Sequence, residues 1–337
     1  MNITGNKAKL FWSGGWDSTF ELCRLSLKPI KVQPIYIVMD RPYHTGQSYE
    51  IKAQDTILEQ LKNRPTTKAD ILPLIRVNRG DIKLPKELLE SYHNFGKQRN
   101  SLGHQYLYMG AYAYKHPGMR VMISDYAHSK GRTMSYIRTG NFQWDEEGTG
   151  YLIKRETPVD VFNIFGKLYY PIAGFDQTYI VDWINQHNFW DVMNNSWTCF
   201  YPINGKPCGF CHCCVTKIKQ GLDRLLSPEA LRRGFVYNYL EKEHEFEVDR
   251  FKRLHYWFCV WLRRKYNPEI PNMKVNYRNL SDITENAKRY EPVIKKLFTD
   301  KEIEDHINKY KNYFEELLAS DIECRTANDR NQWWGLR

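Results

Sequence analysis

The first 132 residues alternate short apolar runs with longer segments in which apolar residues recur at helical spacing. Uninterrupted apolar runs of a few residues predict buried strands. These runs lie at residues 8–12, 35–39, 71–77 and 121–124. Helical spacing is found from Ser18 onward and again over residues 51–61 and 102–114. Strands that alternate with helices in units of this size predict an α/β fold with a parallel sheet.

The pattern changes after Arg132. Two apolar runs, residues 161–165 and 168–172, flank Gly166-Lys167 and predict a β-hairpin. Residues 179–186 are again at helical spacing. From Pro228 onward the chain is almost entirely helical in pattern, with predicted helices at residues 229–242, 247–266, 283–298 and 301–320.

This change of pattern predicts two parts. We expect a domain over residues 1–227, which includes a cysteine-rich segment at residues 199–214, and a helical extension over residues 228–337. With 337 residues, of which 42% are hydrophobic, the chain is long enough to bury a sizeable core.

Neither a membrane span nor a secretion signal is expected from the apolar runs. The longest of them, residues 256–262, has seven residues, whereas a bilayer span needs about 20. The apolar stretch near the amino terminus, residues 10–12, is too short for the apolar region of a secretory signal. We therefore expect a cytoplasmic protein without a membrane partner.

Charge is distributed unevenly along the chain. The net charge is +10, of which +8 falls in residues 1–227 and +2 in residues 228–337. An excess of this kind suits a polyphosphate or nucleic-acid ligand, although a solvated basic face explains it equally well. Residues 250–265 mix basic and aromatic side chains, and here a helix packed through its aromatic face is favoured over a nucleic-acid site. A nucleic-acid partner is therefore not expected.

A glycine loop at residues 13–19, with the sequence Ser-Gly-Gly-Trp-Asp-Ser-Thr, follows the first predicted strand. Glycines let the backbone curl so that several N–H groups point at one phosphate, and a helix amino terminus and hydroxyl groups add further donors. Asp17 either caps the helix or holds Mg²⁺. An ordinary Gly-Gly turn is the alternative. The residues expected to bind nucleotide are Ser13, Gly14, Gly15, Asp17, Ser18 and Thr19.

Five of the eight cysteines fall within residues 199–214. Four of them have the spacing C-x8-C-x2-C-x2-C, namely Cys199, Cys208, Cys211 and Cys214. Four thiolates complete a tetrahedral Zn²⁺ site and leave no open position, so the expected role is structural. The alternatives are a redox thiol pair or core cysteines, and a nucleic-acid-binding zinc ribbon, whose two separated knuckles are not found here.

The glycine loop resembles the PP-loop of the ATP pyrophosphatases, and together with the cysteine spacing it resembles 7-cyano-7-deazaguanine synthase of the queuosine pathway. Further matches are Arg99-Asn100, the run at residues 194–199 and Cys208-Gly209-x-Cys211. The resemblance covers residues 8 to about 225. It implies a Rossmann-like sheet of the adenine nucleotide alpha-hydrolase type.

The resemblance also implies an activity, that of an ATP-dependent carbon–nitrogen ligase using ATP, Mg²⁺ and a structural Zn²⁺. ATP adenylates a 7-carboxy-7-deazaguanine and the loop holds the pyrophosphate. An amine then displaces AMP to give an amide, and a second ATP dehydrates the amide to a nitrile. The residues implied in catalysis are Asp17, Ser18, Arg99 and Asn100. Arg99 would neutralise phosphate charge and Asn100 would form a hydrogen bond. The alternative is that Arg99 forms a surface salt bridge and Asn100 is a turn residue.

Three places depart from the family pattern. Residues 125–132 are more basic, residues 40–44 are altered, and Gln177 replaces a lysine. Adenylation is therefore better supported than ammonia use or the nitrile product. Enlarged relatives in antiviral gene clusters are thought to join a deazaguanine to a protein amine, which is an alternative here. Residues 228–337 would then bind a partner protein or a second copy of the chain. A catalytically inactive nucleic-acid-binding protein is the other alternative.

Overall fold

A computed structural model describes residues 7–39, 46–98, 103–121, 132–200, 202, 205–209, 211–231, 299 and 301. The chain divides into two compact units, one of residues 1–40 and 48–198, the other of residues 41–47 and 199–337. The four cysteines therefore belong to the second unit. The border expected after residue 227 stays a prediction, because residues 232–298 lie outside the described part.

The first unit is built on an eight-stranded, mostly parallel sheet in the order β3-β2-β1-β5-β8-β7-β6, with β4 also paired to β2. β7 is antiparallel to both of its neighbours, and the other pairings are parallel. The α/β class and parallel sheet expected from the sequence are confirmed. The strands are β1 (Lys7–Phe11), β2 (Lys31–Val38), β3 (Asp70–Ile71), β4 (Ile75–Asn78), β5 (Met119–Arg120), β6 (Asn141–Trp144), β7 (Gly150–Ile153) and β8 (Leu168–Tyr170).

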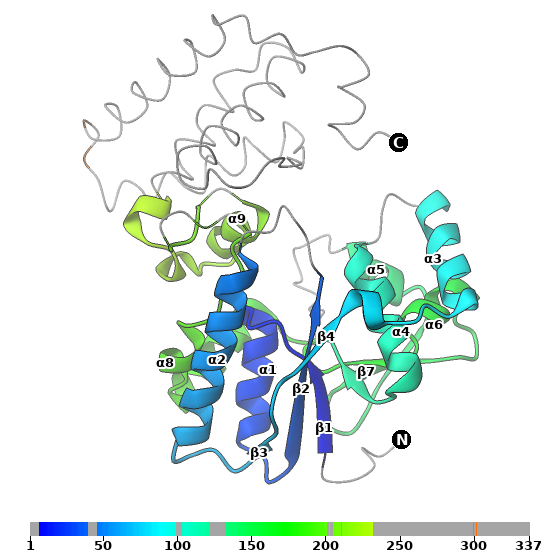
Figure 1. The fold of residues 1–337 in the computed structure, drawn as a ribbon, viewed down its shortest axis with the longest axis horizontal. Coiled ribbons are helices and arrows are strands. Elements are labelled where there is room, and N and C mark those ends of the chain that lie inside the picture. Colours follow the sequence, from blue (N-terminus) through cyan, green and yellow to red (C-terminus); the bar gives the residue numbers. More distant parts are fainter. Residues whose placement is uncertain are drawn as a thin grey trace, which may run out of the picture. The chain divides into compact units, whose positions relative to one another are not determined.

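Helices cover both faces of this sheet. α1, α2 and α8 lie on one side of the strands, and α3, α4, α5 and α6 lie on the other (Figure 1). The helices are α1 (Trp16–Ser26), α2 (Gln47–Asn63), α3 (Lys86–Gln98), α4 (His104–Lys115), α5 (Arg132–Ile137), α6 (Val159–Phe165), α7 (Gln177–His187), α8 (Trp190–Met193) and α9 (His212–Lys219), with short 3-10 turns at Arg79–Asp81 and Asp223–Leu225. α9 belongs to the second unit.

The central strands are buried because helices pack on both sides of them. Leu10 in β1 and Val32 in β2 are completely buried, as are Phe20 and Leu22 in α1 and Ile57 in α2. Such continuous apolar strands are typical of parallel sheets. Helices expected at residues 51–61 and 179–186 are confirmed as parts of α2 and α7, and the helix expected at 102–114 is confirmed from residue 104 onward as α4.

The hairpin expected around Gly166-Lys167 is wrong. Residues 161–165 lie in α6, where Val161, Ile164 and Phe165 are buried. Their spacing of three and one fits one face of a helix better than a strand. The hairpin of this region is instead β6–β7, closed by a turn in which the Asp145 carboxylate accepts the N–H groups of Glu147 and Thr149.

Two other strand predictions are changed in detail. The run at residues 71–77 forms two strands, β3 and β4, along the same strand β2. Pro73 lies between them and has no N–H to donate to the sheet. Where a strand was expected at 121–124, the structure describes β5 at Met119–Arg120, followed by Val121, whose N–H bonds to the Tyr169 carbonyl at 2.9 Å. Residues 122–131 lie outside the described part, as do nearly all residues of the four expected carboxyl-terminal helices.

Among the described residues, no helix is both long enough and apolar enough to cross a membrane.

Candidate functional site

The glycine loop (residues 13–19) connects β1 to α1 at the carboxyl end of β1. β1 has β2 on one side and β5 on the other. After β1 the chain forms β2 on one side of β1, and it later returns to form β5 on the other side of β1. The strand order therefore reverses at β1. Open α/β sheets bind ligands at the carboxyl ends of the strands where the order reverses in this way. The loop is at the position in the sheet where a ligand is expected.

Both glycines of the loop are held in tight surroundings. Gly14 has φ +77°, a left-handed backbone that glycine adopts readily, and a Cβ built there would lie 3.1 Å from Gln54 Cγ of α2. A Cβ on Gly15 would lie 3.2 Å from Thr198 Cγ2 and 3.7 Å from the Trp197 carbonyl oxygen. The loop is therefore enclosed between α2 and the segment at residues 196–198.

The amino terminus of α1 faces the loop without a side-chain cap. Gly15 is the capping residue, its backbone is extended, and no side chain accepts a hydrogen bond at this cap. The first turn of a helix leaves N–H groups for an acceptor and carries partial positive charge. An anion bound in the loop is the natural acceptor for them.

The hydroxyl groups of the loop lie at different depths. Ser13 is exposed, Ser18 is nearly buried and Thr19 is completely buried. Ser18 Oγ donates to the Gly15 carbonyl at 3.3 Å and accepts from the Ser13 N–H at 3.3 Å, so it links the two ends of the loop. Thr19 Oγ1 accepts from the Trp12 indole N–H at 3.2 Å, beneath the loop. Asp17 is half-buried in the first turn of α1.

Segment 196–198 forms a further wall of the site. The Trp197 N–H donates to the Gly14 carbonyl at 2.8 Å, and the Trp197 ring stacks on Tyr49 with centroids 4.9 Å apart. The hydroxyl oxygens of Ser196 and Thr198 are buried and have no hydrogen-bond partner among the described residues. In the sequence these residues belong to the run that leads into the cysteines, and no local pattern predicts that they lie beside a loop far away in the chain.

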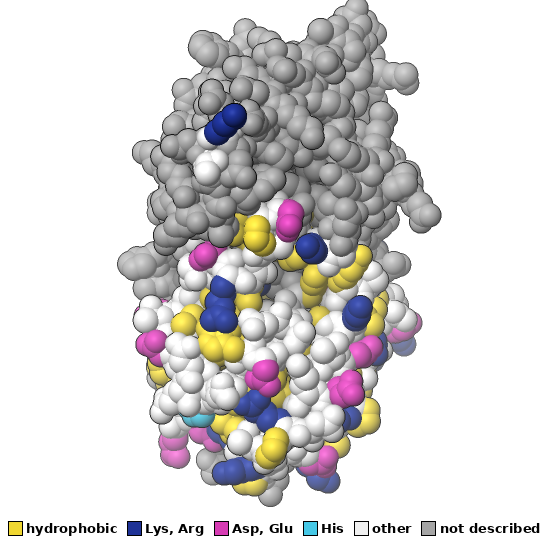
Figure 2. Space-filling view, turned by 90° about the vertical axis from the view of Figure 1, so that its left-hand side faces the viewer, with side chains coloured by type: hydrophobic (Ala, Val, Ile, Leu, Met, Phe, Trp, Pro, Cys, Tyr) yellow, Lys and Arg dark blue, Asp and Glu magenta, His cyan; other side chains and the backbone are white. Residues whose placement is uncertain are grey.

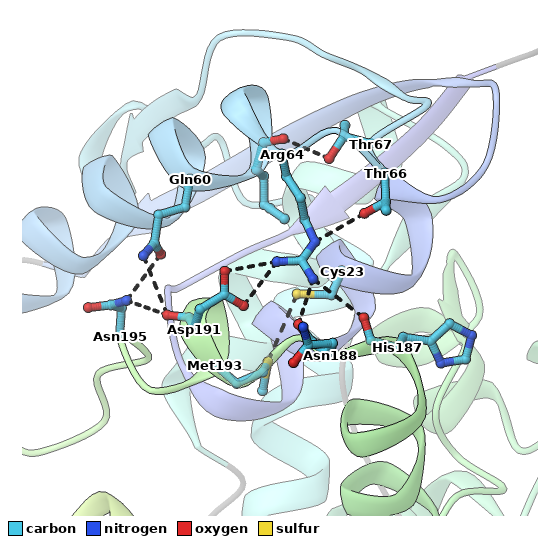
Figure 3. Close-up of polar contacts among 11 residues, drawn as sticks. Cys23, Gln60, Arg64, Thr66, Thr67, His187, Asn188, Asp191, Met193 and Asn195 are labelled. Carbon is cyan, nitrogen blue, oxygen red and sulfur yellow. Dashed lines mark hydrogen bonds and ion pairs between the residues drawn. The ribbon is translucent and has the colours of Figure 1, made fainter.

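A clamp formed by Arg64 fixes this wall (Figure 3). From the end of α2, the Arg64 guanidinium donates to both Asp191 carboxylate oxygens at 2.9 and 2.8 Å and to the Asn188 carbonyl at 2.5 Å. It also lies over the Phe189 ring, 4.1 Å from the centroid. Arg64 thus ties the end of α2 to the α7–α8 connection, a few residues before segment 196–198.

Two further contacts continue this connection. The Asn195 amide donates to Gln60 Oε1 at 3.0 Å and to the Asp191 carbonyl at 2.7 Å. Cys23 donates to the Met193 sulfur at 4.0 Å, and burial raises the pKa of the Cys23 thiol. A buried thiol of this kind is a packing residue rather than a nucleophile.

We predict that Arg64→Ala lowers the free energy of unfolding by about 2 kcal/mol, because it removes a bidentate charged pair, a bond to a carbonyl and the contact with Phe189. Urea unfolding measures the effect. The control is Arg155→Ala, since Arg155 is 88% exposed and its ion pair with Glu156 is exposed as well. Equal unfolding midpoints for the two variants would contradict the clamp.

Two residues implied in catalysis by the family resemblance, Arg99 and Asn100, lie outside the described residues. Their roles stay predictions. Gln177, which replaces a lysine of the family pattern, begins α7, and its amide is buried without a hydrogen-bond partner among the described residues.

In the second unit, the four expected cysteine ligands come together. The sulfurs of Cys199, Cys208, Cys211 and Cys214 are buried and lie within 4.8 Å of one another. Two of the separations are 3.9 Å (Cys208 to Cys214) and 3.5 Å (Cys211 to Cys214). A tetrahedral zinc with Zn–S bonds of about 2.3 Å requires sulfurs about 3.8 Å apart. The cluster can therefore bind a metal such as zinc.

The surrounding backbone favours thiolates in the cluster. The Cys208 N–H donates to Cys199 Sγ at 3.1 Å, and the Cys211 N–H donates to Cys208 Sγ at 3.2 Å. Cys211 caps α9 and Cys214 lies in its first turn, where the helix favours negative charge. Gly209 has φ +91°, and a Cβ there would overlap the Ala230 carbonyl, which explains the glycine after Cys208.

Burial raises the pKa of the Cys199 and Cys208 thiols well above the ordinary value. For Cys211, hydrogen bonds from the other three thiols outweigh burial and hold the pKa well below that value. A divalent cation would displace the thiol protons and give all four sulfurs a ligand role.

Surface charge is mixed on the face shown in Figure 2, where Lys and Arg side chains are interspersed with Asp and Glu. The described residues on this face form no broad basic patch of the kind that binds a nucleic-acid backbone.

None of the protein-family models matches the chain, and no curated protein is similar to it in sequence.

Proposed function

We propose that the protein is an ATP-dependent carbon–nitrogen ligase of the 7-cyano-7-deazaguanine synthase type, which adenylates a 7-carboxy-7-deazaguanine-like carboxylate. The observation that carries this proposal is the position of the glycine loop, at the carboxyl end of β1 where the strand order reverses and directly before α1. A phosphate there meets loop N–H groups and a helix amino terminus without a side-chain cap.

The loop residues would have different roles in binding the ATP phosphates. The backbone at Gly14 and Gly15 and the Ser18 hydroxyl would bind the β- and γ-phosphates, which leave as pyrophosphate. Asp17, a half-buried carboxylate of the loop, would hold Mg²⁺, which supplies charge neutralisation when bound. Because AMP is a good leaving group, the chemistry asks for positioning and charge neutralisation more than for acid–base groups. Arg99 and Asn100 are proposed for the same purpose.

The acceptor of the adenylated carboxylate distinguishes two forms of the proposal. Ammonia gives an amide and then a nitrile, whereas the amine of a partner protein gives a stable amide. The second form is supported by the neutral, buried Gln177 amide in place of a lysine and by the basic sequence at residues 125–132. Residues 228–337 would then provide the docking surface for the partner.

Mass spectrometry of the products tests both forms. The protein is incubated with ATP and 7-carboxy-7-deazaguanine, with ammonium or with proteins encoded beside it. We expect AMP and pyrophosphate together with either a nitrile or a protein adduct heavier by the deazaguanine acyl group. Absence of ATP–pyrophosphate exchange with the carboxylate would reject the ligase. Tight nucleic-acid binding in its place would favour the inactive nucleic-acid-binding protein.

A further inference from the structure

We infer that the hydroxyls of Ser196 and Thr198 donate hydrogen bonds to the phosphate groups held by the glycine loop. This inference rests on the proposed function and assigns it two binding residues outside the loop.

Segment 196–198 lies directly against the glycine loop. The backbone of residues 196–198 is joined to the loop by the hydrogen bond from the Trp197 N–H to the Gly14 carbonyl, 2.8 Å long. Beside it, Thr198 Cγ2 and the Trp197 carbonyl approach Gly15 so closely that a Cβ there would lie 3.2 and 3.7 Å from them. Segment 196–198 is therefore in direct contact with the residues that would cradle a phosphate.

The hydroxyls of the glycine loop and those of segment 196–198 differ in their hydrogen bonding. Those of Ser13, Ser18 and Thr19 all take part in hydrogen bonds with the loop backbone, with each other or with Trp12. Those of Ser196 and Thr198, on the adjoining segment, have no partner among the described residues although both oxygens are buried.

The two hydroxyls without partners have a cost in free energy. A buried hydroxyl without a partner costs about 1–3 kcal/mol. Two of them on residues that flank Trp197 are unusual in a segment that the Trp197–Gly14 bond and the Asn195 amide contacts otherwise hold firmly. A bound anion next to the uncapped start of α1 would give both hydroxyls an acceptor, and bonds to a charged acceptor are stronger than neutral ones.

Thr198→Val and Ser196→Ala test the inference in the full-length protein. Valine keeps the γ-methyl that contacts Gly15 and removes only the hydroxyl. The control is Thr56→Val, since the Thr56 hydroxyl donates to the Lys52 carbonyl on the exposed side of α2. Calorimetric titrations with inorganic pyrophosphate, with Mg·ATP and with adenosine measure binding, and thermal unfolding without ligand measures stability.

We expect Thr198→Val to weaken pyrophosphate and ATP binding about tenfold or more, with unchanged adenosine binding and an unchanged or higher melting temperature. Ser196→Ala should act in the same direction, and Thr56→Val should leave binding unchanged. Loss of ATP affinity without loss of pyrophosphate affinity would place the contact on the α-phosphate.

Two other results overturn the inference. If Thr198→Val binds both phosphate ligands as the unaltered protein does, and melts at a lower temperature, the hydroxyl bonds to a structural water. If the unaltered protein binds neither ligand, the proposed function fails first and the inference fails with it.

Discussion

A Ser18→Ala variant should lose at least about a hundredfold of the rate of carboxylate-dependent ATP–pyrophosphate exchange while keeping its fold. Ser18 Oγ connects the Ser13 N–H with the Gly15 carbonyl, so its removal loosens the loop, and it also deletes the hydroxyl proposed to bind the phosphates. Removal of one preorganised donor to developing charge typically lowers a rate 10²- to 10³-fold. Asp17→Ala should act similarly, through the loss of the proposed Mg²⁺ ligand.

Ser26→Ala is the matched control for this experiment. Ser26 lies at the other end of α1, where its hydroxyl donates to the Cys23 carbonyl at 2.7 Å. This variant should lose some stability and keep its exchange rate. If Ser18→Ala or Asp17→Ala exchanges as fast as the unaltered protein, the assignment of the loop to ATP is wrong.

The second large effect concerns the cysteine cluster. The purified protein should contain one zinc per chain, and Cys208→Ser should remove it and lower the free energy of unfolding by several kcal/mol, because structural zinc contributes directly to folding. Elemental analysis and chemical denaturation measure the two quantities. The variant leaves three thiols around a position that needs four sulfur ligands.

Cys213→Ser is the control for the metal site. Cys213 lies between two of the ligands in sequence, is not one of the four clustered cysteines, and is only half-buried. This variant should keep its zinc and most of its stability. A protein without zinc, or one with the visible absorption of an iron–sulfur cluster, would contradict the assignment.

Much of the fold and part of the site could be predicted because the relevant signals are local. The β1–loop–α1 unit follows from an apolar run, two glycines and a helical repeat within about twenty residues. The cysteine cluster follows from its spacing alone, since ligands separated by two intervening residues on a tight turn can reach one metal. Both signals depend on neighbours in the sequence.

The rest could not be predicted because it depends on contacts between distant residues. Nothing local indicates that Arg64 reaches Asp191, or that Trp197 bonds to Gly14. The expected hairpin failed for a different reason. Residues 161–165 are a short segment of four apolar residues and Asn163, and its length alone does not distinguish a strand from a turn of a buried helix. The packing of α6 against α3 and α4 stabilises the helix at these residues.

The Arg64–Asp191 ion pair joins residues 127 positions apart, and this separation matters while the chain is being made. At about 5–20 residues per second, a ribosome needs on the order of ten seconds to add that length. During this interval β1, the glycine loop and α2 have emerged without the wall that later covers the loop. If the loop binds nucleotide as proposed, binding by the growing chain should begin only after residue 198 has left the ribosome exit tunnel.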